Sequence, residues 1–413
     1  MNAHVQPSKI CGEISAPPSK SYAHRILIAA YLTGKKVTVR NAGASKDVLA
    51  TARALQSLGA EINTQGGTIT VERKTIPLAT TVNCDESGST LRFLLPIAAA
   101  LGVRASFTGQ GRLLSRPIED LVEALNVNGA NIDGLTVKGR LRPGEYWIPA
   151  NISSQYVTGL LFALPLLPGD STIVLVGPSV SRGYVDITLD VLCRFGIRIE
   201  KTASGYYVYG NQKYKALREV SVEGDYSGAA FPLALAAICG KAQVKGLASS
   251  SLQGDAEIVH VLQMFGARVT MRNDHVSVEK SALNAITLDC ENIPDLVQII
   301  SVVAAYAQGV TTLKNVNRLR MKESDRIEAV IEQLRAAGVQ CQFDNGNLTI
   351  HGGKPHSATF QGGNDHRTVM SATVLALGAQ GASTVVGCEP VNKSYTEFFN
   401  DIIKLGGQIN VDV

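Results

Sequence analysis

The stretch that decides the fold is IEDLVEALNVNGANI, residues 118–132, because its pattern returns along the whole chain. Its apolar residues recur at i, i+3, i+4 and i+7, the spacing of one face of an α-helix. Those residues are Ile118, Leu121, Val122 and Leu125. Gly129 follows this face, where a helix often ends in the left-handed conformation that glycine adopts easily. The residues after the glycine are typical of a strand.

This pattern occurs six times, at intervals of 67 to 72 residues. The glycines that mark it are Gly59, Gly129, Gly196, Gly266, Gly338 and Gly406. A second series of glycines follows helices that are apolar on most sides, as buried helices are. Those glycines are Gly34, Gly102, Gly169, Gly240, Gly309 and Gly381. Each unit is therefore predicted to run strand, buried helix, strand, half-exposed helix, strand, strand.

The six units predict an α/β protein of two domains with three units each. A chain of 413 residues is too long for one core, which rarely grows beyond about 250–300 residues. The sixth unit is cut short at residues 411–413, and we expect residues 10–15 to supply its missing strand. One domain would then comprise residues 1–17 and 225–413 and the other residues 18–224. The active site is expected in the cleft between them.

Composition excludes several classes of protein. Hydrophobic residues make up 45% and charged residues 18%, which is typical of a globular chain. A net charge of +4 and 6% aromatic residues do not indicate a nucleic-acid binder. The longest apolar runs, such as residues 229–240, are too short to span a membrane, and no signal peptide is recognisable. Seven cysteines without a C-x-x-C pair favour reduced thiols and a cytoplasmic protein without a metal site.

The placement of cations is more informative than the net charge. Serine and aspartate at helix starts are explained as N-caps, but lysine and arginine there oppose the helix dipole. Eight cations lie at or near predicted helix starts: Lys20, Arg25, Arg112, Arg116, Lys322, Arg326, Arg367 and Lys393. Helix N-termini already favour phosphate and carboxylate, and charge-assisted contacts add to this preference. The pattern predicts a site for small, highly anionic ligands.

Motifs for other chemistry are absent from the sequence. It contains no G-x-x-x-x-G-K-[ST] phosphate loop, no complete G-x-G-x-x-G, no H-E-x-x-H pair and no G-x-S-x-G elbow. Nucleotide, metal and serine-hydrolase mechanisms therefore have no support, and no cofactor is expected.

At its polar clusters the chain closely resembles the EPSP synthase (5-enolpyruvylshikimate-3-phosphate synthase) family of enolpyruvyl transferases. The resemblance covers nearly the whole chain and rests on motifs that occur in the family's order. They are PPSKSYAHR (17–25), ESGSTLR (86–92), GRLLSRPIEDL (111–121), NISSQY (151–156), SVSRGYVDITL (179–189), IPDLVQ (293–298), RMKESDR (320–326), NDHR (364–367) and VNKSYTEFF (391–399).

The resemblance implies the inside-out α/β barrel, two domains each of three βαβαββ units. It also implies the transfer of the enolpyruvyl group of phosphoenolpyruvate to the 5-hydroxyl of shikimate 3-phosphate. That reaction releases phosphate by addition and elimination and belongs to the shikimate pathway of chorismate and aromatic amino-acid synthesis. We expect a monomer whose partners are these two substrates, without nucleic acid or membrane.

The resemblance further implies roles for individual residues. Asp295 would act as base toward the 5-hydroxyl and Glu323 would make the other proton transfer, while Lys20 would be catalytic and near both ligands. The residues for shikimate 3-phosphate would be Lys20, Ser21, Arg25, Ser153, Ser154, Gln155, Ser181, Tyr184, Asp295 and Lys322. Those for phosphoenolpyruvate would be Lys20, Gly88, Arg112, Gln155, Arg326, Arg367 and Lys393.

Four positions depart from the commonest family pattern: Glu86, Ser89, Phe93 and Arg318. Gly88 remains glycine, the small residue that admits glyphosate in this family, so we expect glyphosate to inhibit. Three alternatives stay open at this stage. They are the enolpyruvyl transferase for UDP-N-acetylglucosamine, the related RNA 3′-phosphate cyclases, and a binding module without catalysis. The first of these usually carries a reactive cysteine in the arginine loop, and residues 109–117 contain none.

Overall fold

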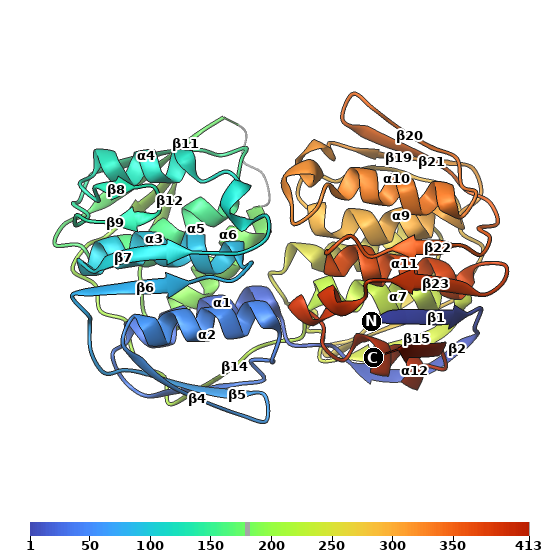
Figure 1. Cartoon of the computed structure of the whole chain (residues 1–413), viewed down its shortest axis with the longest axis horizontal. Helices are drawn as coiled ribbons and strands as arrows, with labels where there is room; N and C mark the ends of the chain where they lie inside the picture. The colour runs from blue at the N-terminus through green and yellow to red at the C-terminus, as the bar shows by residue number, and fades with distance from the viewer. Residues whose placement is uncertain (178–181, 413) are drawn as a thin grey trace. The chain divides into compact units, whose positions relative to one another are not determined.

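The computed structural model describes residues 1–177 and 182–412, which separate into two compact units (Figure 1). Unit 1 comprises Met1–Ser19 and Glu223–Val413, and unit 2 comprises Lys20–Val222. Each unit has a hydrophobic core of its own. The chain therefore crosses from one unit to the other twice, after Ser19 and after Val222.

Unit 2 consists of short strands and helices in a recurring order. Its elements are α1 (Lys20–Leu32), β3 (Val37–Arg40), α2 (Lys46–Ser57), β4 (Ala60–Gln65), β5 (Thr68–Arg73), β6 (Ala79–Asn83), α3 (Gly88–Leu101), β7 (Arg104–Thr108), η1 (Leu113–Ser115), α4 (Glu119–Val127), β8 (Ile132–Asp133), β9 (Thr136–Val137), β10 (Glu145–Pro149), α5 (Ser154–Ala163), η2 (Leu164–Leu166), β11 (Ser171–Val176), α6 (Arg182–Arg194), β12 (Ile199–Thr202), β13 (Gly205–Val208) and β14 (Glu219–Ser221).

Unit 1 repeats the same order. Its elements are β1 (Asn2–Gln6), β2 (Ile10–Ser15), α7 (Tyr226–Cys239), β15 (Gly240–Lys245), η3 (Gly254–Glu257), α8 (Ile258–Met264), β16 (Arg268–Met271), β17 (His275–Glu279), β18 (Thr287–Asp289), η4 (Pro294–Leu296), α9 (Val297–Ala305), β19 (Val310–Lys314), η5 (Asn317–Met321), α10 (Arg326–Ala336), β20 (Cys341–Asp344), β21 (Asn347–His351), β22 (Thr359–Gln361), α11 (His366–Gly378), β23 (Ser383–Val386), η6 (Glu389–Lys393), α12 (Phe398–Lys404) and β24 (Gln408–Asp412).

Within the described residues the strands form six sheets of four strands, and all six have one topology. In each sheet the first two strands are parallel, as β10 and β11 are, and the buried helix α5 connects these two. The second strand then pairs antiparallel with the fourth, and the fourth with the third, as in the order β10-β11-β13-β12. The predicted βαβαββ units are confirmed by this topology.

The prediction for the missing strand of the sixth unit is wrong. β1 fills that place, antiparallel to both β23 and β24, so that Asn2 faces Val386 on one side and Asp412 on the other. β2, the segment expected there, instead runs parallel to β15. The fourth place needs a strand antiparallel to its neighbours. β1 also buries Ala3 and Val5 on one face, an alternation too short to notice in the sequence.

In one sheet of each unit, the first strand is distant in sequence from the parallel strand with which it pairs. β2 precedes α1 in sequence but pairs with β15 in unit 1, whereas β14 precedes α7 but pairs with β3 in unit 2. The two strands therefore lie next to the two points at which the chain changes unit.

The helices of the first glycine series end as predicted. All six of those glycines have a positive φ, and for Gly59 the value is 91°. The buried helices are also confirmed, since every residue of α7 and of α9 is buried. The starts of the buried helices α1, α3, α5 and α11 carry the candidate site residues Lys20, Gly88, Ser154 and Arg367. No helix among the described residues is long and apolar enough to cross a membrane.

Candidate active site

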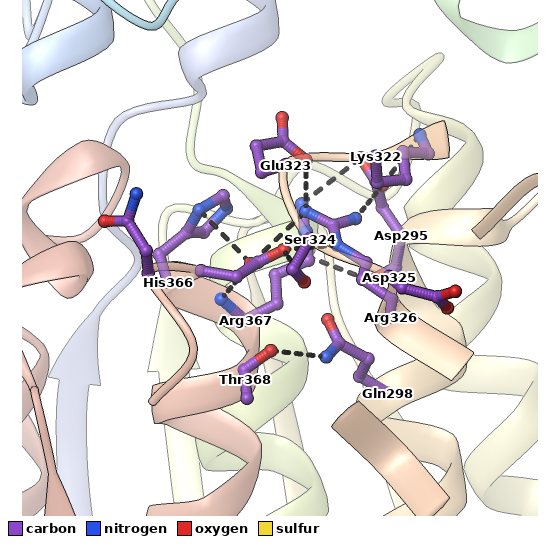
Figure 2. A network of polar contacts seen from close by, with 12 residues as sticks. Asp295, Gln298, Lys322, Glu323, Ser324, Asp325, Arg326, His366, Arg367 and Thr368 are labelled. Carbon is purple, nitrogen blue, oxygen red and sulfur yellow. Dashed lines mark hydrogen bonds and ion pairs between the residues drawn. The ribbon is translucent and has the colours of Figure 1, made fainter. Parts of the chain in front are cut away.

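In unit 1, three helix starts bring the predicted residues together (Figure 2). Asp325 caps α10 by accepting hydrogen bonds from the first-turn amides, and Asp365 caps α11 in the same way. Asp295 lies in η4, directly before α9. Polar residues cap these helices because first-turn N–H groups have no partner within the helix. The caps thereby fix the starting points of the side chains that follow.

Arg326 is the centre of this cluster. Its side chain is only 2% exposed, and its three nitrogens donate to three different carboxylates. Nη1 lies 2.8 Å from Asp295, Nη2 lies 2.8 Å from Glu323, and Nε lies 2.8 Å from Asp365. These charges raise the pKa of the guanidinium above its ordinary value despite burial, so the group is always charged. Figure 2 shows two of these carboxylates, Asp295 and Glu323, beside Arg326.

Asp295 is surrounded by cations but stays accessible. Besides Arg326, its carboxylate accepts from Lys322 at 3.2 Å and from Arg367 at 3.3 Å. Arg367 also donates to the backbone carbonyl of Asp295 at 2.9 Å. The Asp295 side chain is 18% exposed, whereas Asp365 is fully buried. Asp295 is therefore an oriented carboxylate that a ligand can reach.

The pKa of Lys322 is lower than that of an ordinary lysine. Burial lowers its pKa, the carboxylate of Asp295 offsets part of this effect, and Arg326 adds to the lowering. A lysine with a lowered pKa can exchange a proton with a substrate more easily than an unperturbed one.

Two further cations of unit 1 are anchored nearby. The Nη2 atom of Arg367 donates to Ser227 at 2.6 Å, in addition to its contacts with Asp295. Lys393, which is 8% exposed, donates to the carbonyl of Asn364 at 2.8 Å. Asn364 and Asp365 precede α11, so Lys393 lies close to the start of that helix. Both cations are thus held in place before any ligand binds.

In unit 2, α1 carries the first group of predicted residues. The ammonium of Lys20 forms an ion pair of 3.0 Å with Asp47, which lies in the first turn of α2. Arg25 is buried, and its guanidinium donates to the backbone carbonyl of Ser21 at 2.8 Å. It also donates to Thr188 at 2.8 Å and to the carbonyl of Tyr184 at 2.9 Å.

Burial lowers the pKa of Arg25 to about 10, which leaves the group charged at neutral pH. Its guanidinium carbon also lies 5.0 Å from the centre of the Phe93 ring, a position that departs from the family pattern. Arg25 is therefore a fixed cation inside unit 2.

The start of α5 carries a second group. Ser153 caps the helix through the amide of Gln155, and Ser154 is its first residue. The Gln155 side chain donates to Ser89 at 3.0 Å and accepts from Arg92 at 3.2 Å. Gln155 thus joins α5 to the start of α3.

Gly88, the first residue of α3, lies against two arginines. A Cβ atom there would lie 2.6 Å from Nη1 of Arg92 and 2.8 Å from Nη1 of Arg116. Arg112, the arginine named in the sequence analysis, is instead exposed and makes no side-chain cap to η1. The structure therefore places Arg116, rather than Arg112, beside Gly88. The two arginines flank the short helix η1, and only the loop geometry distinguishes them.

Tyr184 is the third residue of α6. The backbone carbonyl of Tyr184 accepts from Arg25 and from the Thr188 hydroxyl. Ser181 lies outside the described residues. Among the described residues no His, Cys, Asp or Glu side chains are grouped as metal ligands.

Comparison with known proteins shows the family of the chain. The family model for EPSP synthase (3-phosphoshikimate 1-carboxyvinyltransferase) matches residues 5–402. The chain belongs to the EPSP synthase family. Proteins named 3-phosphoshikimate 1-carboxyvinyltransferase from Clostridium kluyveri and Clostridium acetobutylicum are 36% and 38% identical to it. Each of these two alignments covers 98% of this chain and 97% of the relative.

Solved structures of EPSP synthase share the fold. An EPSP synthase of Acinetobacter baumannii superposes with a TM-score of 0.86 at 24% identity, over 100% of both chains. The enolpyruvyl transferase NikO of Streptomyces tendae gives a TM-score of 0.79 at 17% identity, over 99% of this chain and 98% of its own. At these identities the likeness concerns the fold alone.

Sequence reasoning assigned no ligand or partner to four residues that the structure places in the clusters of this EPSP synthase family member, although it counted Arg116 among the cations at helix starts. They are Asp47, Arg116, Ser227 and Asp365, which contact Lys20, Gly88, Arg367 and Arg326 respectively. Asp47, Ser227 and Asp365 stand at helix starts, where a cap alone explains them. Their pairing with cations depends on which helices are neighbours, and a single sequence does not specify this.

Proposed function

We propose that this chain transfers the enolpyruvyl group of phosphoenolpyruvate to the 5-hydroxyl of shikimate 3-phosphate and releases phosphate. Membership of the family and the names of the relatives support this reaction. The observation that best supports this reaction is a pair of carboxylates, Asp295 and Glu323. Each is held 2.8 Å from the same buried guanidinium, that of Arg326. An addition followed by an elimination needs two such proton-transfer groups beside a strong positive field.

Phosphoenolpyruvate would be bound by the fixed cations. We assign its phosphate and carboxylate to Lys20, Gln155, Arg326, Arg367 and Lys393, with the backbone at Gly88. Arg116 takes the role that the sequence analysis gave to Arg112, because it is Arg116 that lies beside Gly88. Charge-assisted contacts of this kind each contribute roughly 1.5–3 kcal/mol.

Shikimate 3-phosphate would be bound mainly by unit 2. Ser21, Ser153, Ser154 and Tyr184 lie at helix starts there, where N–H groups and hydroxyls favour a phosphate ester. Arg25 supplies a fixed charge behind them. Asp295 and Lys322 of unit 1 would contact the ring hydroxyls. Ser181 is assigned to the same ligand on the sequence resemblance alone.

The chemical steps then follow from the two carboxylates. Asp295 accepts the proton of the 5-hydroxyl while the hydroxyl oxygen attacks C2 of phosphoenolpyruvate. Glu323 delivers a proton to C3. The tetrahedral intermediate then loses phosphate, which the surrounding cations bind and which takes the proton held by Asp295, while C3 returns a proton to Glu323 as the double bond is restored. Lys20 and Lys322 stabilise the negative charge that develops on the leaving phosphate.

The two units would act on one pair of substrates. The residues assigned to phosphoenolpyruvate are divided between them, since Gly88 and Gln155 belong to unit 2 and Arg326 to unit 1. We propose that the enzyme is a cytoplasmic monomer in which the substrates bind in a cleft between the domains, without a cofactor or metal. Exclusion of water on closure would strengthen the electrostatic contacts.

The direct test incubates the protein with both substrates and measures released phosphate together with the mass of the organic product. We expect phosphate and the enolpyruvyl ether in equal amounts, and neither when one substrate is omitted. Phosphate release without formation of the ether would contradict the proposal.

A further inference from the structure

Four polar side chains form a buried hydrogen-bond chain inside unit 2. Nδ1 of His24 lies 2.7 Å from the Thr51 hydroxyl, which lies 2.6 Å from the Thr90 hydroxyl. The Thr90 hydroxyl donates to the Ser87 hydroxyl at 2.8 Å. All four side chains are at most 1% exposed, and they come from α1, α2, α3 and the residue that caps α3.

Each hydroxyl in this hydrogen-bond chain has only one hydrogen to donate, and this fixes the direction of every hydrogen bond. Because Thr90 donates to Ser87, Thr51 must donate to Thr90, and His24 must donate to Thr51 through Nδ1. The imidazole is neutral, since burial lowers the pKa of His24 well below its ordinary value and the charges of Lys20 and Arg25 add to this. Its Nε2 atom is buried and has no hydrogen-bond partner in residues 1–177 and 182–412.

Folding alone does not require these groups. The surrounding core of unit 2 is apolar, and buried polar groups cost free energy unless they are fully paired. Apolar residues of similar size would pack the same helix junction without that cost. Buried polar chains that break the local pattern are expected where geometry must be held for function.

The hydrogen-bond chain from His24 to Ser87 begins one helical turn after the candidate site residue Lys20 on α1. His24 is four residues after Lys20 on α1, and Thr51 is four residues after Asp47 on α2. The His24–Thr51 hydrogen bond therefore repeats, one turn further in, the Lys20–Asp47 ion pair of 3.0 Å. At its other end the chain reaches Ser87, the residue directly before Gly88.

We propose that His24 and Thr51 are positioning residues for the phosphoenolpyruvate subsite. They hold the start of α1, with Lys20, in register with the start of α3, with Gly88. The inference rests on the proposed function, which places phosphoenolpyruvate at these two helix starts. The contacts of shikimate 3-phosphate on α1, α5 and α6 are held together by the hydrogen bonds of Arg25 to Thr188 and to the Tyr184 carbonyl, which the His24–Ser87 hydrogen-bond chain does not include.

Thr51→Val tests the proposal in the full-length protein, because it removes the hydroxyl with little change in shape. We expect the KM for phosphoenolpyruvate to rise about ten-fold while the KM for shikimate 3-phosphate changes less than two-fold. Thr51→Ser keeps the hydroxyl and is expected to restore the wild-type KM. The matched control is Thr373→Val in unit 1, a buried threonine that donates only to the Val369 carbonyl of its own helix.

The result that overturns the proposal is an unchanged KM for phosphoenolpyruvate in Thr51→Val, or equal rises in both KM values. Failure of the proposed function looks different, because wild-type protein would then form no product from this substrate pair. If Thr51→Val does not fold, imidazole nitrogen chemical shifts of the wild type decide. The proposal requires neutral His24 protonated at Nδ1 at pH 7, and protonation at Nε2 would refute it.

Discussion

The guanidinium of Arg326 donates a hydrogen bond of 2.8 Å to the carboxylate of Asp295, and the two groups differ sharply in exposure. Arg326 is 2% exposed and Asp295 is 18% exposed. The guanidinium of Arg326 is therefore the more enclosed group of the pair, and the carboxylate of Asp295 is the more accessible one. In the proposed mechanism this one ion pair would serve both folding and catalysis.

Asp295→Asn should lower kcat by about two to three orders of magnitude, since an amide cannot accept the hydroxyl proton. The KM for shikimate 3-phosphate should change much less, because asparagine retains the size and one oxygen of the side chain. Steady-state phosphate release measures both quantities. Asp344→Asn, on the exposed strand β20, is the control. Turnover within ten-fold of wild type would exclude Asp295 as the base.

Asp365 should make stability depend on pH. Burial alone would raise its pKa, but the charges of Arg326 and His366 lower the pKa from its ordinary 3.8 to about 2. A lowered carboxyl pKa stabilises the folded state above the unfolded-state value, and that stabilisation is lost as the pH falls through the folded-state value.

Asp365→Asn should therefore reduce the free energy of unfolding by about 3 kcal/mol above pH 5, because it leaves a buried cation short of a partner. The difference from wild type should shrink by about 2 kcal/mol between pH 4 and pH 2. Urea unfolding at a series of pH values measures it. A difference that stays constant down to pH 2 would show that Asp365 is not the titrating group.

Arg116 and Arg112 form a natural pair for comparison. Arg116→Ala should raise the KM for phosphoenolpyruvate by at least ten-fold, because it removes a guanidinium beside Gly88. Arg112→Ala should leave it within about two-fold, since Arg112 is exposed. The reverse ranking of the two variants would return the role to Arg112.

Gly88→Ala should weaken the binding of both phosphoenolpyruvate and glyphosate. The added methyl group would lie within 3 Å of Arg92 and Arg116, so at least one guanidinium must move. We expect wild type to be inhibited by glyphosate and the variant to require a higher concentration for half inhibition. Gly353→Ala, where an added Cβ atom meets no other atom within 4 Å, serves as the control. An unchanged inhibition curve for Gly88→Ala would show that glyphosate does not approach this residue.

The repeat and its glycines were predictable because helix and strand periodicities are local properties of the sequence. The six left-handed glycines of the first series show this directly. The place of β1 was not predictable, since its pairing with β23 and β24 joins residues almost 400 positions apart. The motifs likewise pointed to Asp295, Glu323 and Arg326, but not to Asp365, whose role depends on the neighbouring helix.

Shikimate 3-phosphate is the proposed acceptor of the enolpyruvyl group. Phosphate release with phosphoenolpyruvate plus shikimate 3-phosphate, compared with phosphoenolpyruvate plus UDP-N-acetylglucosamine, tests it most directly. We predict rapid release with shikimate 3-phosphate and only background release with the sugar nucleotide. Phosphate release with phosphoenolpyruvate plus UDP-N-acetylglucosamine, but not with phosphoenolpyruvate plus shikimate 3-phosphate, would contradict the assignment.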